Sequence, residues 1–149
     1  MLGELSGVQI DKVLANNVIG RLGCHDMNET YVVPITYVYD GAAIIGHSAP
    51  GKKINMMRSN PRVCFQIDQM QNMRSWQSVV VWGRYEELKG KEAVMAMDIF
   101  TKKLSPLMTS ETSKPIHEFS QEKFNPADMK SIVFKINIGK KTGRFEKEG

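Results

Sequence analysis

The segment Gly46–Lys53, which reads GHSAPGKK, holds the residue types that bind phosphate groups. Gly46, Gly51 and Lys52 have the spacing of the nucleotide-binding P-loop, but Lys53 stands where that loop needs the hydroxyl group of Ser or Thr for Mg²⁺. A P-loop also requires a parallel strand before it and a long helix after it. Here a predicted hairpin strand precedes the segment and only about two helical turns follow it. The sequence therefore argues against a nucleoside triphosphatase.

The same segment can bind a phosphate group without being a P-loop. Two adjacent lysines, a glycine that lets backbone N–H groups approach, and the start of a short helix all favour an anion. The surrounding sequence is basic, because Asp68 is the only acidic residue between Asp40 and Glu86. The basic residues of that interval are Lys52, Lys53, Arg58, Arg62, Arg74 and Arg84. Adjacent lysines are more commonly a solvated surface pair, so both interpretations remain open at this point.

The composition is that of a folded globular protein. The chain has 149 residues, of which 42% are hydrophobic and 24% charged, and we expect one domain over residues 1–149. No window approaches the roughly 18 apolar residues of a membrane span, and the N-terminal segment lacks the order of a signal peptide, so we expect a cytoplasmic location and no membrane partner. The net charge of +4 is concentrated in the central segment, which favours a compact anionic ligand over a nucleic-acid partner.

The cysteines and histidines do not have the spacing of a metal or redox site. Cys24 and Cys64 each lie in an apolar run and form no C-x-x-C pair, so we expect free thiols. His25, His47 and His117 are far apart in the sequence, and we expect no metal ion.

Six segments have the composition of β-strands, and most are joined by short turns. Pro34 lies within one of them and places that strand at an edge, at a bulge or at an opening of the sheet. Asp40-Gly41 predicts a hairpin with a type I′ turn. The predicted strands are Val18–His25, Thr30–Asp40, Ala42–Ser48, Arg62–Asp68, Trp76–Leu88 and Ser131–Ile138.

The predicted helices are few. Ser6 can cap a helix that runs to about Asn16, Lys91–Leu104 has apolar residues at helical spacing, and shorter helices are expected at Ile54–Ser59 and Pro126–Lys130. Strands and helices do not alternate, which argues against a doubly wound sheet. The sequence therefore predicts a mainly β fold, a small antiparallel barrel with a few helices.

Four motifs in order resemble one protein family. GRLGC, VVPITYVYDG, IIGHSAPGKKINMMRSNPRVCFQID and WQSVVVWGRYEEL are similar to the flavin-binding split-barrel proteins related to pyridoxamine 5′-phosphate oxidase, in particular the nitroimidazole-resistance-like branch. The similarity covers about residues 17–88 and resumes weakly at the final strand and at Thr142-Gly143-Arg144. It implies a six-stranded split barrel, an FMN cofactor and a homodimer with its flavin sites at the subunit interface.

The resemblance also implies the residues of the cofactor site. Lys52 and Lys53 match the basic pair at the FMN phosphate, and His47 and Ser48 match the strand end beside the flavin. The strand whose backbone lies along the isoalloxazine ring is matched by Pro34, Ile35, Thr36 and Tyr37. The strand that approaches the cofactor from a neighbouring region or from the partner subunit is matched by Trp76 and Ser78.

The resemblance points to an FMN-dependent oxidoreductase that reduces small electron-poor molecules such as nitroaromatics, with NADH or NADPH as the electron donor. His47 is the candidate catalytic residue, as a hydrogen-bond or proton donor, although a histidine that only lines the pocket fits equally well. The sequence ends in GKKTGRFEKEG and lacks the Arg/His segment and Arg-Leu-Ala-Pro finish of the authentic oxidases, so vitamin B6 oxidation is not expected. The alternatives are a flavin-binding module without turnover and the same barrel holding deazaflavin or haem.

Overall fold

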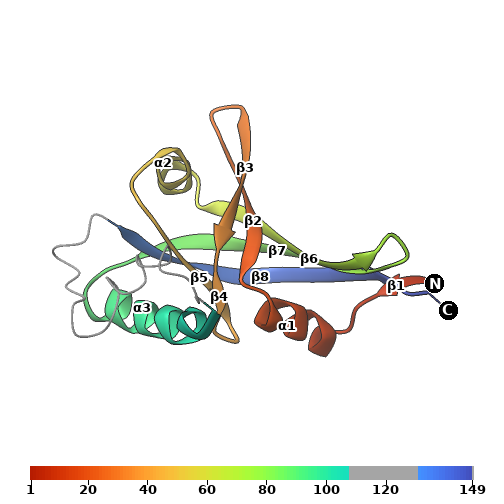
Figure 1. The fold of residues 1–149 in the computed structure, drawn as a ribbon. Coiled ribbons are helices and arrows are strands. Elements are labelled where there is room, and N and C mark those ends of the chain that lie inside the picture. The colour runs from red at the N-terminus through yellow and green to blue at the C-terminus, as the bar shows by residue number, and fades with distance from the viewer. Residues whose placement is uncertain (108–130, 149) are drawn as a thin grey trace.

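The structure is a computed structural model that describes residues 1–107 and 131–148 (Figure 1). Its helices are α1 (Gly7–Asn16), α2 (Lys52–Ser59) and α3 (Gly90–Leu104), with a 3₁₀ turn, η1, at Ser105–Leu107. Its strands are β1 (Leu2–Glu4), β2 (Ile19–Asp26), β3 (Glu29–Thr36), β4 (Val38–Tyr39), β5 (Ala43–Ser48), β6 (Arg62–Asn72), β7 (Ser75–Leu88) and β8 (Ile132–Glu146).

The strands form one curled antiparallel sheet in the order β3-β2-β6-β7-β8-β5-β4, with β1 added beside β8. Each of the six predicted ranges overlaps a strand, and the predicted strand Thr30–Asp40 is divided at Tyr37 into β3 and β4. The mainly β prediction is therefore confirmed. The helix expected at Pro126–Lys130 lies outside the described residues.

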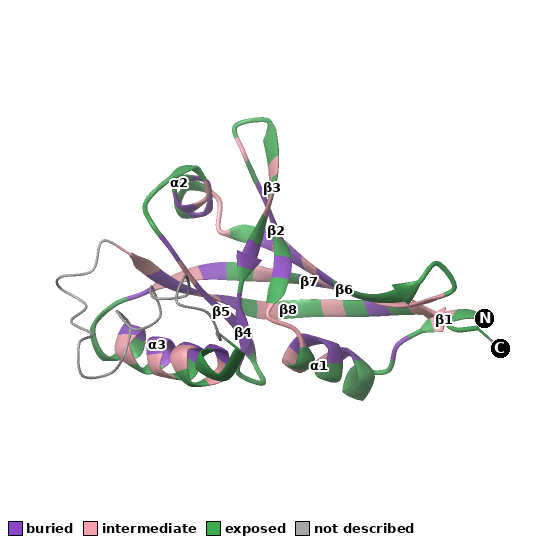
Figure 2. Cartoon of the chain, viewed as in Figure 1, coloured by how far each residue is buried: buried purple, intermediate pink, exposed green. Residues whose placement is uncertain are grey.

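The sheet wraps around a hydrophobic core, and α1 and α2 also pack against that core (Figure 2). The alternation along β6 separates the two faces of the sheet, because Val63, Phe65 and Ile67 are buried whereas Arg62 and Asp68 are exposed. We call the surface of β3, β2, β6, β7 and β8 that is directed away from this core the outer face.

A second, smaller core lies under α3. Its buried members are Val38, Ile45, Leu88, Ala93, Ala96, Met97, Phe100, Leu104 and Val133. The apolar stripe of α3 predicted from helical spacing thus packs on β4, β5 and the start of β8. This packing places α3 beside the end of β5 that leads into the segment GHSAPGKK.

One of the two hairpin turns differs from the sequence prediction. Both central residues of the β2–β3 turn, Met27 and Asn28, have positive φ values of 47° and 63°, as a type I′ turn requires. In the β4–β5 turn only Gly41 has a positive φ, 98°, so the type I′ prediction for Asp40-Gly41 is wrong. The hairpin itself is confirmed, because the Asp40 carboxylate accepts hydrogen bonds from the backbone N–H groups of Ala42 and Ala43.

Candidate functional site

Helix α2 begins inside the segment GHSAPGKK. Its N-cap residue is Gly51, and no side chain caps the helix. The first hydrogen bond of the helix joins the Asn55 N–H group to the Gly51 carbonyl, so the preceding backbone N–H groups, those of Lys52, Lys53 and Ile54, have no partner within the helix. The first turn also holds no acidic residue. This end of α2 therefore presents unpaired donors and the positive end of the helix dipole.

The two lysines at this end of α2 have different surroundings. Lys52 forms an ion pair with Glu29 and lies with its Nζ 5.0 Å from the ring centroid of Tyr31. The hydrogen bond to Glu29 raises the pKa of Lys52. Lys53 is partly buried, and its charge acts on His47. The structure thus places Lys53 and His47 in one electrostatic environment.

His47 is half-buried where β5 meets α3. Its ring packs edge-on against Phe100, with 4.8 Å between the ring centroids, and its Nδ1 lies 3.3 Å from the Ser131 hydroxyl. Burial, and then the charge of Lys53, lower the pKa of His47 below its ordinary value of 6.5. At neutral pH the imidazole is therefore uncharged and holds one N–H donor and one acceptor.

The segment Pro34–Tyr37, which was predicted to lie along the flavin ring, is at the edge of the sheet. Strand β3 pairs only with β2 among the described strands, which confirms the edge position inferred for Pro34. Pro34 and Thr36 are exposed on the outer face, whereas Ile35 and Tyr37 are buried. The Tyr37 hydroxyl donates a hydrogen bond of 2.7 Å to the Leu14 carbonyl, and burial raises its pKa. Ile35 and Tyr37 can therefore offer a ligand only their backbone.

The hydroxyl group of Ser48 is also unavailable to a ligand. Ser48 is buried, and its hydroxyl donates to the carbonyl of Ala49 at 2.8 Å. On β4, Val38 lies opposite Ile45 of β5, whereas Thr36, two residues before Val38, pairs with Ile19 on β2. The structure thus places His47 at the end of β5, a few residues before the start of α2, and leaves Thr36 on β3.

Trp76 and Ser78 lie near the far end of β7. Trp76 is opposite Glu146 on β8, whereas His47 is opposite Val133 on the same strand, so the two are separated by roughly 40 Å measured along β8. The Trp76 indole donates a hydrogen bond of 3.1 Å to Glu146. Within one chain the structure therefore does not bring Trp76 to His47.

Ser78 is connected across the outer face to the strand next to the predicted ring-binding strand. Its hydroxyl accepts a hydrogen bond of 3.1 Å from the Gln66 amide. Gln66 is opposite Arg21, and Arg21 is opposite Pro34. Arg21 is held in turn by an ion pair of 2.8 Å with Asp68. Polar side chains on the outer face therefore extend from Ser78 on β7 to Arg21 on β2, the strand next to β3.

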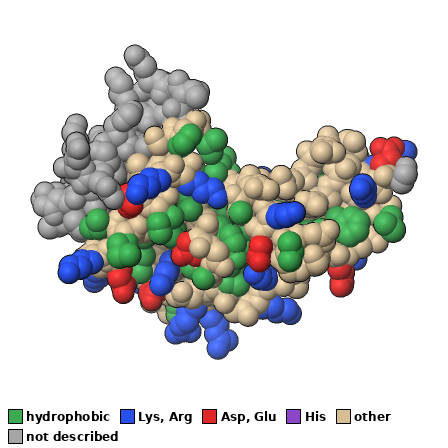
Figure 3. All heavy atoms as spheres, turned by 90° about the horizontal axis from the view of Figure 1, so that it is seen from below, with side chains coloured by type: hydrophobic (Ala, Val, Ile, Leu, Met, Phe, Trp, Pro, Cys, Tyr) green, Lys and Arg blue, Asp and Glu red, His purple; other side chains and the backbone are tan. Residues whose placement is uncertain are grey.

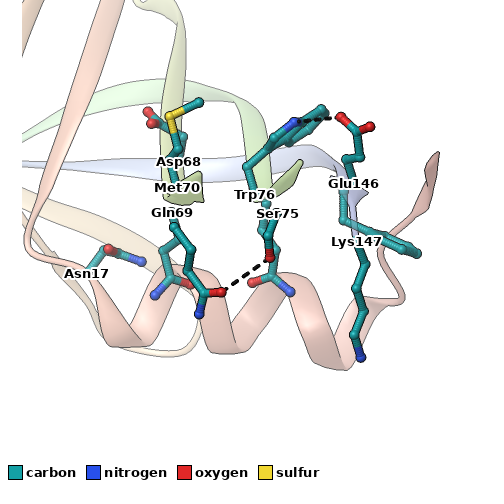
Figure 4. A pocket seen from close by; sticks show the side chains of 11 residues that line it. Asn17, Asp68, Gln69, Met70, Ser75, Trp76, Glu146 and Lys147 are labelled. Atoms are coloured by element: carbon teal, nitrogen blue, oxygen red, sulfur yellow. Dashed lines mark hydrogen bonds between the residues drawn. The ribbon is translucent and has the colours of Figure 1, made fainter. Parts of the chain in front are cut away.

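A pocket of about 640 Å³ lies at the Trp76 end of the sheet (Figure 4). It is rich in carboxamides, which are those of Asn17, Gln69, Gln71 and Gln77. Trp76 and Glu146 project to one side of the sheet, whereas Gln69 and Ser75 project to the other (Figure 4). Of the ten predicted cofactor residues, this pocket contains Trp76 alone.

Four neighbours of the predicted residues were missed by the sequence analysis. Glu29 and Tyr31 contact Lys52, and their shared face of β3 is readable from the alternation of that strand. Phe100 and Ser131 contact His47. These two contacts carried no sequence signal, because they depend on how α3 and the start of β8 pack against β5.

The described surface offers no extended basic patch in the view of Figure 3 and no metal site. Basic and acidic side chains are interspersed among hydrophobic ones over the described part of the face in Figure 3. Among residues 1–107 and 131–148, no group of three His, Cys, Asp or Glu side chains could hold a metal ion. Cys24 and Cys64 are both free thiols, as predicted. None of the described helices is long and apolar enough to cross a membrane.

The chain matches a family model over most of its length. The model is that of pyridoxamine 5′-phosphate oxidase, and it matches residues 8–132. The chain belongs to the pyridoxamine 5′-phosphate oxidase family. The match runs from α1 to the first residue of β8 and includes the whole of the GHSAPGKK segment.

Solved structures share the fold of this family member. A FAD-binding protein from Mesorhizobium loti superposes with a TM-score of 0.76 at 33% identity, over 99% of this chain and 98% of that one. A protein proposed to act in 5-nitroimidazole antibiotic resistance in Bacteroides thetaiotaomicron superposes with a TM-score of 0.72 at 20% identity, over 97% and 87% of the two chains, which shows the fold alone. The predicted family and split-barrel fold are thus confirmed.

A relative of closer sequence covers a shorter part of the chain. An uncharacterized protein from Rhizobium meliloti (strain 1021) is 44% identical over 84 residues. This match spans 56% of this chain and 56% of that protein.

Proposed function

We propose that this pyridoxamine 5′-phosphate oxidase family member binds FMN and reduces small electron-poor molecules such as nitroaromatics. The observation that carries the proposal is the start of α2, where unpaired backbone N–H groups, Lys52 and Lys53 lie together without an acidic residue in the first turn. Such a helix end favours a phosphate group. The relative from Mesorhizobium loti, which is a FAD-binding protein, supports a flavin as the ligand.

The residues present fit the rest of a flavin. Strand β3 is an edge strand, so the backbone groups on its unpaired side can contact the edge of a ring. Pro34 has no N–H group that would need a partner there. His47 adds one uncharged polar side chain beside the charge of Lys53. Lys52 and Lys53 would hold the phosphate, and the β3 backbone with Thr36 would lie along the ring.

A homodimer would complete this site. The outer face carries the large hydrophobic side chains Ile19, Val32 and Met70, which are 55%, 63% and 60% exposed. An exposed apolar surface of this kind is typical of a protein interface. A second copy packed there would cover these side chains and could bring its own Trp76 and Ser78 to the flavin of the first chain, whereas within one chain Trp76 lies far from His47.

A flavin held by Lys52, Lys53 and the β3 backbone would supply the electron transfer of the proposed reaction, from NADH or NADPH to the acceptor. The chain would bind the phosphate through Lys52 and Lys53, and the dimer interface would exclude water from the flavin. His47 is placed to donate a hydrogen bond or a proton to the acceptor, because its neutral imidazole holds one N–H group.

The test is a visible absorption spectrum of the purified protein after addition of FMN and removal of the excess, followed by anaerobic reduction with NADH or NADPH and addition of a nitroaromatic acceptor. We expect retained flavin bands, bleaching by the donor and recovery with the acceptor. Loss of recovery in His47→Ala with FMN still bound supports the catalytic role of His47. Retained flavin that no acceptor reoxidises faster than air would instead indicate a flavin-binding module without turnover, and a protein that ignores FMN would contradict the proposal.

A further inference from the structure

Three basic side chains and a tryptophan surround a second pocket, which is separate from the start of α2. The pocket has a volume of about 360 Å³ and lies over β6, β7 and β8. Its lining residues are Arg62, Val63, Trp82, Gly83, Arg84, Asn137, Gly139 and Lys140. None of them is acidic, so the positive charge of this pocket is not neutralised by its own walls.

The two arginines of this pocket lie directly opposite each other. The β6–β7 pairing places Arg62 opposite Arg84, and like charges at such positions destabilise a sheet. Three other arginines, Arg21, Arg58 and Arg74, form ion pairs with acidic residues, whereas Arg144 forms none within the described part of the chain. Among the described residues, neither Arg62 nor Arg84 forms an ion pair. The repulsion between them would be relieved by an anion that contacts both.

Trp82 supplies a different kind of contact in the same pocket. It is 43% exposed, and the Nζ atom of Lys140 lies 5.2 Å from its ring centroid. The β7–β8 register shifts between Trp82 and Gly83, so the indole lies at a β-bulge. Bulges often redirect a side chain at a functional site. An exposed indole beside cations can stack on an aromatic ring.

We propose that this pocket binds a phosphate group attached to an aromatic ring, as in a mononucleotide. Arginine guanidinium groups bind phosphate through paired hydrogen bonds, so one phosphate can contact both Arg62 and Arg84. The ring stacks on Trp82, and Lys140 adds a further positive charge. The pocket volume is near the lower limit of about 300 Å³ for small-molecule sites, which suits a ligand of this size.

The site does not depend on the proposed flavin site. It shares the outer face with the proposed dimer contact, but Arg62 and Met70 lie at opposite ends of β6, roughly 26 Å apart along the strand, so a second copy over Ile19 and Met70 leaves the pocket accessible. Alternation along β6 places Arg62 on the outer face, whereas α2 packs against the core through Ile54, Met56 and Met57. A nucleotide bound at Trp82 would therefore not contact the backbone N–H groups at the start of α2.

The two tryptophans of the chain, Trp76 and Trp82, allow a direct test. In the Trp76→Phe background, Trp82 is the only tryptophan, and its fluorescence is followed while adenosine 5′-monophosphate is added. We expect saturable quenching, with adenosine and inorganic phosphate each binding at least about ten-fold more weakly because each lacks one of the two contacts. Arg84→Gln should weaken binding of the nucleotide at least about ten-fold, whereas the matched control Arg74→Gln should not change it.

Two further measurements test whether the nucleotide binds in this pocket. Inorganic phosphate should raise the Tm of the wild type more than that of Arg84→Gln, which also shows that the variant folds. Quenching by the nucleotide should persist in Lys52→Ala/Lys53→Ala, so that failure of the flavin site does not remove it. Absence of quenching, or equal quenching by adenosine, would overturn the proposal. So would an Arg84→Gln variant that alters the oligomeric state while the nucleotide leaves Trp82 unaffected, because these arginines would then contact a second copy.

Discussion

The two ends of helix α2 differ in whether their positive charge is paired with an acidic side chain. At the C-terminal end, the Arg58 guanidinium donates hydrogen bonds of 2.8 and 3.2 Å to Glu87, and the Tyr85 hydroxyl donates one of 2.7 Å to the same carboxylate. The bond from Arg58 lowers the pKa of Glu87. At the N-terminal end, Lys53 has no acidic partner among the described residues and the backbone N–H groups have no capping side chain.

This difference distinguishes a positive charge that stabilises the fold from one that can bind a ligand. The ion pair of Arg58 and Glu87 joins the end of α2 to β7, and the carboxylate neutralises the charge of Arg58. At the lysine end, the first backbone N–H groups of α2 and the charge of Lys53 have no partner among the described residues, so they can bind a ligand. Lys52 is intermediate, because it contacts Glu29 at the surface.

The largest effect is expected at the lysine end. The double variant Lys52→Ala/Lys53→Ala should lower the affinity for FMN at least about a hundred-fold, because charge-assisted hydrogen bonds to the phosphate are lost. The Tm should change little, since alanine is a good helix former and the ion pair of Lys52 with Glu29 lies at the surface, where such pairs contribute little. Flavin fluorescence during titration measures the affinity, and thermal unfolding measures the Tm. Unchanged affinity would break the comparison between the two ends.

A smaller and opposite effect is expected at the arginine end. Arg58→Gln should lower the Tm by a few degrees, because a partly exposed ion pair is lost, and should leave the affinity for FMN unchanged. Glu87→Gln should lower the Tm similarly, and the double variant should not be additive, because both changes remove the same pair. An Arg58→Gln variant that loses FMN as the lysine variant does would show that both ends serve the ligand.

The smallest effect concerns the pH dependence of stability at His47. Burial lowers the pKa of His47 below 6.5, so the folded protein binds this proton less readily than the unfolded chain does. Stability from the neutral imidazole is therefore complete above about pH 6.5 and is lost as the pH falls below it. His47→Phe, which keeps a ring against Phe100, should reduce the fall in Tm between pH 7 and pH 5.5. An identical fall in both proteins would show that His47 titrates normally.

Local signals in the sequence were sufficient for much of the fold. The helix cap at Ser6, the helical spacing in α3 and the restriction of Pro34 to an edge, a bulge or an opening of the sheet were each readable within a few residues. Strand β8 was predicted to end at Ile138 but continues to Glu146, because pairing with β7 and β1 stabilises a basic, polar segment that has no strand pattern of its own.

The site was less predictable than the fold for the same physical reason. The phosphate-binding role proposed for GHSAPGKK rests on local features, two lysines and a helix start, and in the structure α2 does begin at Lys52. The contacts of His47 with Phe100 and Ser131, and the separation of Trp76 from His47, follow from packing and register over the whole sheet. Such long-range relations cannot be derived from the spacing of residues in the chain.

The most direct measurement of the central claim changes the ligand and leaves the protein intact. The affinity of the wild-type protein for FMN should be compared with its affinity for riboflavin, which has the same ring system and no phosphate. If the start of α2 binds the phosphate, FMN should bind at least about a hundred-fold more tightly than riboflavin. Equal affinities would show that the phosphate is not recognised and would contradict the role assigned to Lys52 and Lys53.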